Sequence, residues 1–100
     1  MKKRILITGS GGFLGSRLAE YFEGKDGYET VAVTHEELDI TDMVAVSAFF
    51  KAIRPQAVLH CAGLSNTGQC EADPLASGRI NVQGTENIAR ACRESGCRLI

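Results

Sequence analysis

Three glycines, at positions 9, 12 and 15, lie between a short apolar run and an amphipathic segment. The run is Arg4–Thr8, and strand, turn and helix in this order place backbone N–H groups where they can bind the phosphates of a nucleotide. Gly9 would allow the tight turn, Gly12 the approach of a pyrophosphate, and Gly15 close packing of the helix on the sheet. The spacing is G-x-x-G-x-x-G, not the commoner G-x-G-x-x-G. It predicts a dinucleotide site, since a glycine-rich surface turn would not require this order.

The cysteines and histidines do not have the spacing of a metal site. No C-x-x-C pair occurs, and neither His35 nor His60 lies near two cysteines at metal-ligand spacing. We therefore expect no metal and interpret the thiols as reduced and at least half buried. The four cysteines are Cys61, Cys70, Cys92 and Cys97.

Length and charge limit the classes of function. One hundred residues form one domain at most, and a net charge of −1 argues against nucleic acid or an anionic membrane as a partner. No apolar run approaches the roughly 20 residues of a membrane span. The basic start, Lys2–Arg4, is followed only by Ile5–Ile7, which is too short for a secretory signal. We expect a cytoplasmic protein.

Hydrophobic patterning predicts strands and helices in alternation, which indicates an α/β fold with a parallel sheet covered on both faces. The fold class expected is a Rossmann-type, doubly wound sheet. The predicted strands are Arg4–Thr8, Glu29–Thr34, Ala57–Cys61 and Arg98–Ile100. The predicted helices are Gly12–Phe22, Asp42–Ile53 and Pro74–Ser95.

Details of the predicted helices follow from single residues. Leu14, Leu18 and Phe22 recur at the period of one helical face, which we expect to be buried. Thr41 is the expected N-cap of the second helix. Gly84 interrupts the third helix and should weaken it by up to about 1 kcal/mol.

The chain ends on the start of an apolar strand, Arg98–Ile100. A complete doubly wound sheet continues for two or more further strands. We therefore expect residues 1–100 to be the incomplete dinucleotide-binding domain of a longer protein, with its C-terminal part and substrate region absent.

Four segments together resemble the extended short-chain dehydrogenase/reductase superfamily along essentially the whole chain. Within it, the chain is most similar to the dTDP-4-dehydrorhamnose reductase group. The resemblance implies NAD or NADP as the cofactor. The segments are Thr8–Gly15, Leu38–Asp42, Arg54–Gly63 and Cys70–Gly84.

The resemblance also implies roles for residues at matching positions, all of them in cofactor binding. Asp39 would accept a hydrogen bond from the adenine amino group, with Ile40 beside the ring. Asn81 would lie near the floor of the active site. The residues expected to hold the pyrophosphate are Gly9, Gly12, Phe13, Leu14 and Gly15. Those expected to line the nicotinamide-side ribose are Cys61, Ala62 and Gly63.

Each of these roles has a purely structural alternative. Asp39 could cap the helix that follows. Residues 61–63 could be a tight exit from a strand, and Asn81 could face solvent. His60 is expected to pack within its strand or to bond a neighbour rather than to act in catalysis.

The sequence does not decide between NAD and NADP. Selection of NAD usually places a carboxylate at the end of the second strand. Here that end is Thr34-His35, with Glu36 and Glu37 just beyond. Glu36 could still bind the ribose, whereas His35 could contact the ribose or a 2′-phosphate.

Enzymes of this superfamily use a Tyr-x-x-x-Lys pair, in which the lysine lowers the pKa of the tyrosine. The chain contains this spacing at Tyr21 and Lys25. We reject the pair because it lies at the end of the first helix, away from the carboxyl edge of the sheet. The catalytic pair is expected beyond Ile100, and no residue of this chain is assigned to catalysis.

The resemblance leaves several hypotheses for the parent protein. The favoured one is an NAD(P)-dependent reductase of a nucleotide-linked 4-keto deoxysugar. Alternatives are a sugar-nucleotide epimerase or dehydratase, a non-catalytic nucleotide-binding regulatory subunit, and a structural protein without a nucleotide. The expected partners are the dinucleotide and a nucleotide-sugar, and a homodimer is compatible with the resemblance.

Overall fold

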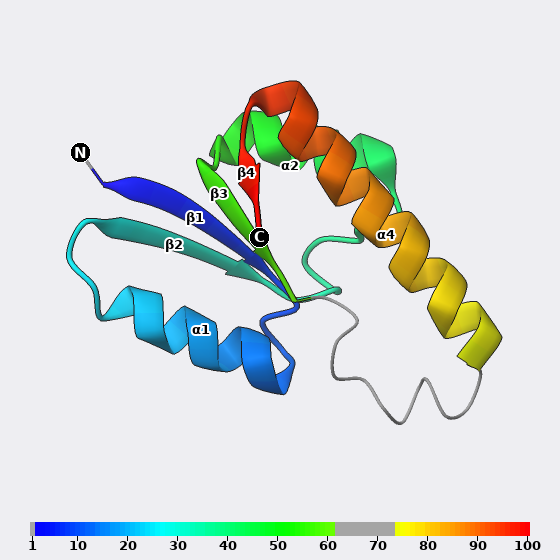
Figure 1. Ribbon diagram of the computed structural model, residues 1–100, viewed down its shortest axis with the longest axis horizontal. Coiled ribbons are helices and arrows are strands. Elements are labelled where there is room, and N and C mark those ends of the chain that lie inside the picture. The colour runs from blue at the N-terminus through cyan, green and yellow to red at the C-terminus, as the bar shows by residue number, and fades with distance from the viewer. Residues whose placement is uncertain (1, 62–73) are drawn as a thin grey trace.

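The computed structural model describes residues 2–61 and 74–100, and it describes residues 74–80 by their backbone alone. Strands and helices alternate along the chain, which confirms the predicted fold class (Figure 1). The elements are β1 (Lys3–Thr8), α1 (Phe13–Glu23), β2 (Tyr28–Val33), α2 (Met43–Ile53), β3 (Ala57–His60), α4 (Pro74–Ser95) and β4 (Arg98–Leu99).

The strands form one parallel sheet in the order β2-β1-β3-β4. From β1 the chain moves to one side to form β2 and then returns past β1 to form β3. As a result, α1 covers one face of the sheet, and α2 and α4 cover the other (Figure 1). The strand order reverses between β1 and β3, and ligands of such sheets bind beyond the carboxyl ends of the strands at this point.

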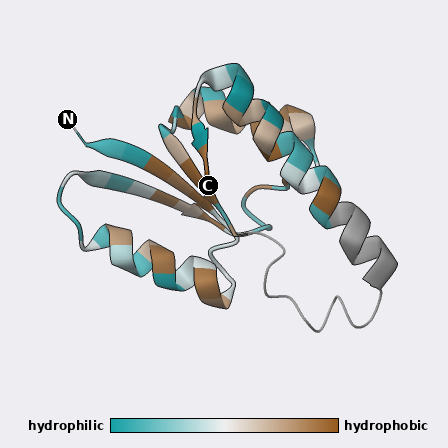
Figure 2. Ribbon diagram, in the orientation of Figure 1, coloured by the Kyte–Doolittle hydropathy of each residue, from teal (hydrophilic) through white to brown (hydrophobic). Residues whose placement is uncertain are grey.

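Two hydrophobic cores lie on opposite faces of the sheet because side chains alternate along a strand. Leu6 points to the α2 and α4 side, whereas Ile5 and Ile7 point to the α1 side. Figure 2 shows hydrophobic residues in the strands where they run between the helices. The first core contains Leu6, Val33, Leu38, Val46, Phe50, Val58, Ile88, Ala91 and Cys92. The second contains Ile5, Ile7, Ala19 and Cys61.

The buried face of α1 differs in part from the predicted one. Leu18 and Phe22 pack against the second core as expected, but Leu14 is 45 % exposed. Gly15 and Ala19 are the buried positions of this helix. The buried stripe therefore runs through positions 15, 18, 19 and 22, and Leu14 lies at its border.

The N-cap of α2 is Asp42, so the prediction of Thr41 is wrong by one residue. The Asp42 carboxylate accepts hydrogen bonds from the backbone N–H groups of Val44 at 3.1 Å and Ala45 at 3.2 Å. Thr41 instead donates its backbone N–H and its hydroxyl to Asp39. Both side chains are suitable caps, and the bond to Asp39 decides between them.

Strand ends differ from the predicted ones by one residue. β2 begins at Tyr28, which pairs with Lys3, and ends at Val33 because Thr34 opens a turn. β3 ends at His60, and Cys61 follows it. These shifts leave the same residues at the carboxyl edge of the sheet.

Candidate functional site

The turn after β1 is built from backbone hydrogen bonds. Gly9 has a φ of 71°, a conformation that glycine adopts without strain, and its carbonyl accepts from the N–H of Gly12 at 3.0 Å. The N–H of Ser10 donates to the carbonyl of Val33 at 3.0 Å. The glycine turn is thereby fixed to the ends of β1 and β2.

The N-terminus of α1 has no side-chain cap among the described residues. Gly12 is its N-cap, in an extended conformation with φ −85° and ψ 171°. Its carbonyl accepts the first bond of the helix, from the N–H of Ser16 at 3.0 Å. The first N–H groups of a helix carry its positive dipole end, so this bare backbone is suited to an anion.

Gly15 lies in backbone contact with the turn. A Cβ at this position would lie 2.2 Å from the carbonyl oxygen of Gly9 and 3.1 Å from the Cα of Ser10. Any side chain would push α1 away from the end of β1. This contact supports the packing role expected for Gly15 and explains the glycine at this position without any ligand.

The ends of β1 and β3 are joined by Thr8, which is almost fully buried. The N–H of Cys61 donates to the Thr8 carbonyl at 3.2 Å and to Thr8 Oγ1 at 3.1 Å. Cys61 is also buried, and burial raises the pKa of its thiol. Cys61 therefore offers its backbone, not a thiolate, at this edge of the sheet.

His60 bridges three elements at the same edge. Its Nδ1 lies 2.7 Å from Thr8 Oγ1 of β1, and its Nε2 lies 3.0 Å from Thr85 Oγ1 of α4. Burial lowers the pKa of His60, so the imidazole is neutral at pH 7. The expectation that His60 bonds a neighbour is confirmed. Thr8 and Thr85 were not predicted as its partners, because the pairing needs the strand register Thr8–His60.

The segment after β2 carries both His35 and the carboxylates considered for the ribose. His35 is exposed. Glu37 turns back along the chain, and its Oε1 accepts from the N–H of Thr34 at 2.9 Å. The Glu37 carboxylate thus closes the turn after β2.

Asp39 is exposed and held by its neighbour. Its Oδ1 accepts from the backbone N–H of Thr41 at 3.0 Å and from the Thr41 hydroxyl at 2.5 Å. These two bonds hold the pKa of Asp39 below its usual value, so it is a carboxylate at neutral pH. Asp39 does not cap α2, which excludes the structural alternative that the sequence left open.

Five further predicted residues have different outcomes. Asn81 is half-buried on α4, at the spacing that places it on the same face as Gly84 and the buried Ile88. Ala62 and Gly63 lie outside the described residues. Phe13 and Leu14 are exposed beside the glycine turn, at 70 % and 45 %.

The Tyr21 and Lys25 pair lies at the opposite end of α1 from the glycine turn. Lys25 Nζ lies 4.7 Å from the centroid of the Tyr21 ring, and Tyr21 is 58 % exposed. The two side chains thus form a cation–π contact on the surface. This place in the fold supports the rejection of the pair as a catalytic centre.

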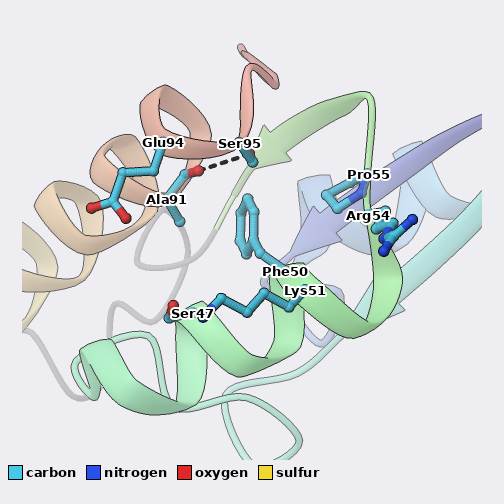
Figure 3. A pocket seen from close by; sticks show the side chains of 8 residues that line it. All are labelled: Ser47, Phe50, Lys51, Arg54, Pro55, Ala91, Glu94 and Ser95. Carbon is cyan, nitrogen blue, oxygen red and sulfur yellow. Dashed lines mark hydrogen bonds between the residues drawn. The ribbon is translucent and has the colours of Figure 1, made fainter.

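A cavity of about 490 Å³ lies between α2 and α4 (Figure 3). Arg54 and Ser95 lie in its wall, at the ends of the helices that lead into the amino ends of β3 and β4. The cavity is therefore remote from the glycine turn. It is lined by Ser47, Phe50, Lys51, Arg54, Pro55, Ala91, Glu94 and Ser95.

Residues 2–61 and 74–100 contain no group of three or more metal-ligating side chains. No described helix has both the length and the apolar character to span a bilayer.

The RmlD substrate binding domain family matches residues 2–100. The chain belongs to this family. The resemblance to the dTDP-4-dehydrorhamnose reductase group is thereby confirmed, and the sheet is of the Rossmann type found in these NAD(P)-binding reductases.

Relatives and solved structures extend this assignment. A dTDP-4-keto-6-deoxy-D-glucose reductase of Streptomyces niveus is 35 % identical over 100 residues, which are all of this chain and 34 % of that protein. A crystal structure of the Bacillus anthracis dTDP-4-dehydrorhamnose reductase in complex with NADP superposes with a TM-score of 0.87 and 33 % identity. It covers 99 % of this chain and 35 % of that one.

Another relative is named as an enzyme subunit and not as a reductase. The methionine adenosyltransferase 2 subunit beta of Xenopus tropicalis is 30 % identical over 104 residues, covering 98 % of this chain and 31 % of that protein. The chain thus spans about a third of the length of the relatives that it matches.

Proposed function

We propose that residues 1–100 are the dinucleotide-binding part of a reductase that acts on a nucleotide-linked 4-keto deoxysugar. The observation that carries this proposal is the bare N-terminus of α1, packed through Gly15 against the turn after β1. It lies where the strand order reverses, which is where such sheets bind their ligands. The names of the family's reductases and the NADP in the related crystal structure support it.

The pyrophosphate would be held by backbone N–H groups of the glycine turn and the first turn of α1. Gly9 shapes the turn, Gly12 presents no side chain to the phosphates, and Gly15 keeps the helix close. Phe13 and Leu14 contribute their backbone N–H groups, since their side chains point to the exposed surface. The positive end of the helix stabilises the two phosphate charges.

The remaining parts of the dinucleotide would lie along the carboxyl edge of the sheet. Asp39 accepts from the adenine amino group, and Ile40 lies beside the ring. His35 lies near the adenosine ribose or a 2′-phosphate. On the nicotinamide side, residues 61–63 line the ribose through their backbone, and Asn81 lies near the floor of the active site.

The bound cofactor would supply the hydride that reduces the substrate carbonyl. The residues of this chain bind and orient the cofactor. The hydrogen bonds between Thr8 and Cys61 hold the carboxyl ends of β1 and β3 together beside it. The proton for the substrate oxygen comes from a Tyr-x-x-x-Lys pair beyond residue 100. Tyr21 and Lys25 do not serve, because they lie at the other end of α1.

The pyrophosphate site is tested by Gly12→Val in the full-length protein. The extended conformation of Gly12 is open to valine, so the variant should fold. Its side chain would occupy the place of a phosphate, and we expect binding of NADPH or NADH to be abolished in calorimetry. An unchanged affinity in the folded variant would refute the assignment. The same titrations of the unmodified protein decide between the two cofactors.

A regulatory subunit is the second candidate. The observation that favours it is the similarity to a relative whose name marks it as a subunit of a larger enzyme, the methionine adenosyltransferase 2 subunit beta. The assay that separates the candidates follows oxidation of NADPH in the presence of a dTDP-4-keto-6-deoxy sugar. A reductase consumes one NADPH for each sugar reduced. A regulatory subunit binds the cofactor without turnover, and an epimerase converts sugar without net oxidation.

A further inference from the structure

Asn87 of α4 has a buried side-chain amide that donates a hydrogen bond to a loop distant in sequence. Its side chain is 6 % exposed, and Nδ2 donates to the backbone carbonyl of Ile40 at 2.9 Å, across 47 residues of sequence. Its Oδ1 accepts from Gln83 Nε2 at 3.0 Å. Both ends of the amide are therefore satisfied, as a buried polar group requires. No local pattern in the sequence indicates this contact, because it depends on how α4 packs against the Ile40 segment.

Gly84 of the same helix forms a second contact with Ile40. A Cβ at position 84 would lie 2.4 Å from Ile40 Cδ1 and 2.6 Å from Cγ1. The Ile40 side chain is thus seated directly on the backbone of α4. Positions 84, 87 and 88 share one helical face, and Ile88 is fully buried in the first core. The expected cost of Gly84 to helix stability is offset by this close packing.

The contacts from Asn87 and Gly84 hold Ile40, the residue that follows Asp39, in place. The Asp39 carboxylate is oriented by Thr41 through Oδ1, and Ile40 lies between the two. The backbone of residues 39–41 therefore determines where Asp39 Oδ2 points. Asp39 is exposed, and Oδ2 accepts no hydrogen bond from the described residues. It is available to a ligand.

We propose that Asn87 and Gly84 are positioning residues that hold Ile40 so that Asp39 recognises the amino group of adenine. The inference rests on the proposed function, because it deepens the adenine end of that site. Neither residue touches the cofactor. Their effect is to make the protein select an adenine ring over a ring without the amino group.

The test compares the reduced cofactor with its deamino analogue, in which hypoxanthine replaces adenine. Calorimetry with the full-length protein gives the ratio of the two Kd values. One hydrogen bond to a carboxylate predicts a preference for adenine of roughly tenfold or more in the unmodified protein. In Asn87→Leu and in Gly84→Ala, we expect this preference to fall below about twofold.

Two variants are used because Asn87→Leu leaves the Ile40 carbonyl without its donor and could fail to fold. Gly84→Ala removes no hydrogen-bonding group from α4 and adds a better helix former, so any effect arises from the displacement of Ile40. Gln83→Ala is the matched control, since it removes a bond to Asn87 but does not touch Ile40. It should keep the full preference for adenine.

The outcomes separate this inference from the proposed function. If the folded variants lose affinity for both ligands equally and keep the ratio, Asn87 and Gly84 are only structural and the inference is wrong. A ratio near one in the unmodified protein also overturns it, although the pyrophosphate site would stand. If the unmodified protein binds neither ligand, the proposed function fails first.

Discussion

At the scale of single residues, His60 gives the clearest dependence on pH. Burial between Thr8 and Thr85 lowers its pKa below the ordinary value of 6.5. In the unfolded chain the imidazole therefore takes up a proton at a higher pH than in the folded protein. Stability should fall as the pH drops below about 6.5 and should level off below the pKa of the folded protein.

The measurement is the free energy of unfolding in urea at several pH values between 8 and 5. In His60→Gln, which keeps a side-chain hydrogen-bonding group, the decline over this range should be shallower. His35→Gln is the control, because His35 is exposed, and it should keep the original slope. An equal slope in His60→Gln and the unmodified protein would contradict the assignment.

The partners of His60 show what could not be predicted from the sequence at this scale. Apolar runs identify strands, and the polar ends of those runs suggest which residues lie at the carboxyl edge. The bond from His60 to Thr8 spans 52 residues and depends on the strand register. The bond from Asn87 to Ile40 depends on how α4 packs. Neither pairing has a local signal.

At the scale of elements, the junction of β1 and α1 should be sensitive to one methyl group. Gly15→Ala places a Cβ 2.2 Å from the Gly9 carbonyl oxygen, which is a backbone atom and cannot rotate away as a flexible side chain would. We expect a loss of about 1–3 kcal/mol in the free energy of unfolding from this overpacking. Because the glycine turn must shift, cofactor affinity should also fall by roughly tenfold or more.

Gly24→Ala is the matched control for this substitution. Gly24 ends the same helix with a φ of −82°, and a Cβ there would lie 3.7 Å from the Tyr21 carbonyl oxygen, an ordinary contact. Urea unfolding and calorimetry should show little change. If Gly15→Ala behaves like Gly24→Ala, the close contact between α1 and the turn does not shape the site.

The elements themselves could largely be predicted, since each is specified by local patterning. The differences arise where two local preferences compete. Thr41 and Asp42 are both good caps, and Thr41 is drawn into a turn with Asp39, which leaves Asp42 at the helix. At Gly84 the sequence and the structure differ in another way. The sequence predicts that this glycine lowers helix stability, but it does not predict that Ile40 packs against the backbone of α4 at this position.

At the scale of the whole molecule, one sheet divides two cores, and each core holds a buried cysteine. Cys61 lies in the core on the α1 side, and Cys92 lies in the core on the α2 and α4 side. Burial raises the pKa of the Cys61 thiol and raises that of Cys92 to about 12. Because thiolates are the reactive form, both thiols should be inert in the folded protein.

The accessibility of these two thiols shows whether the two cores, on opposite faces of the sheet, unfold together. We expect them to become accessible only when the sheet unfolds, because β1 and β3 contribute side chains to both cores. In variants of the full-length protein that retain only Cys61 or only Cys92, Ellman's reagent should then react with equal dependence on urea concentration. If one thiol reacts at a clearly lower urea concentration than the other, the core that contains it unfolds independently. Cooperative opening would mean that the glycine turn and the Asp39 segment, on opposite faces, are stabilised as one unit by any ligand that spans them.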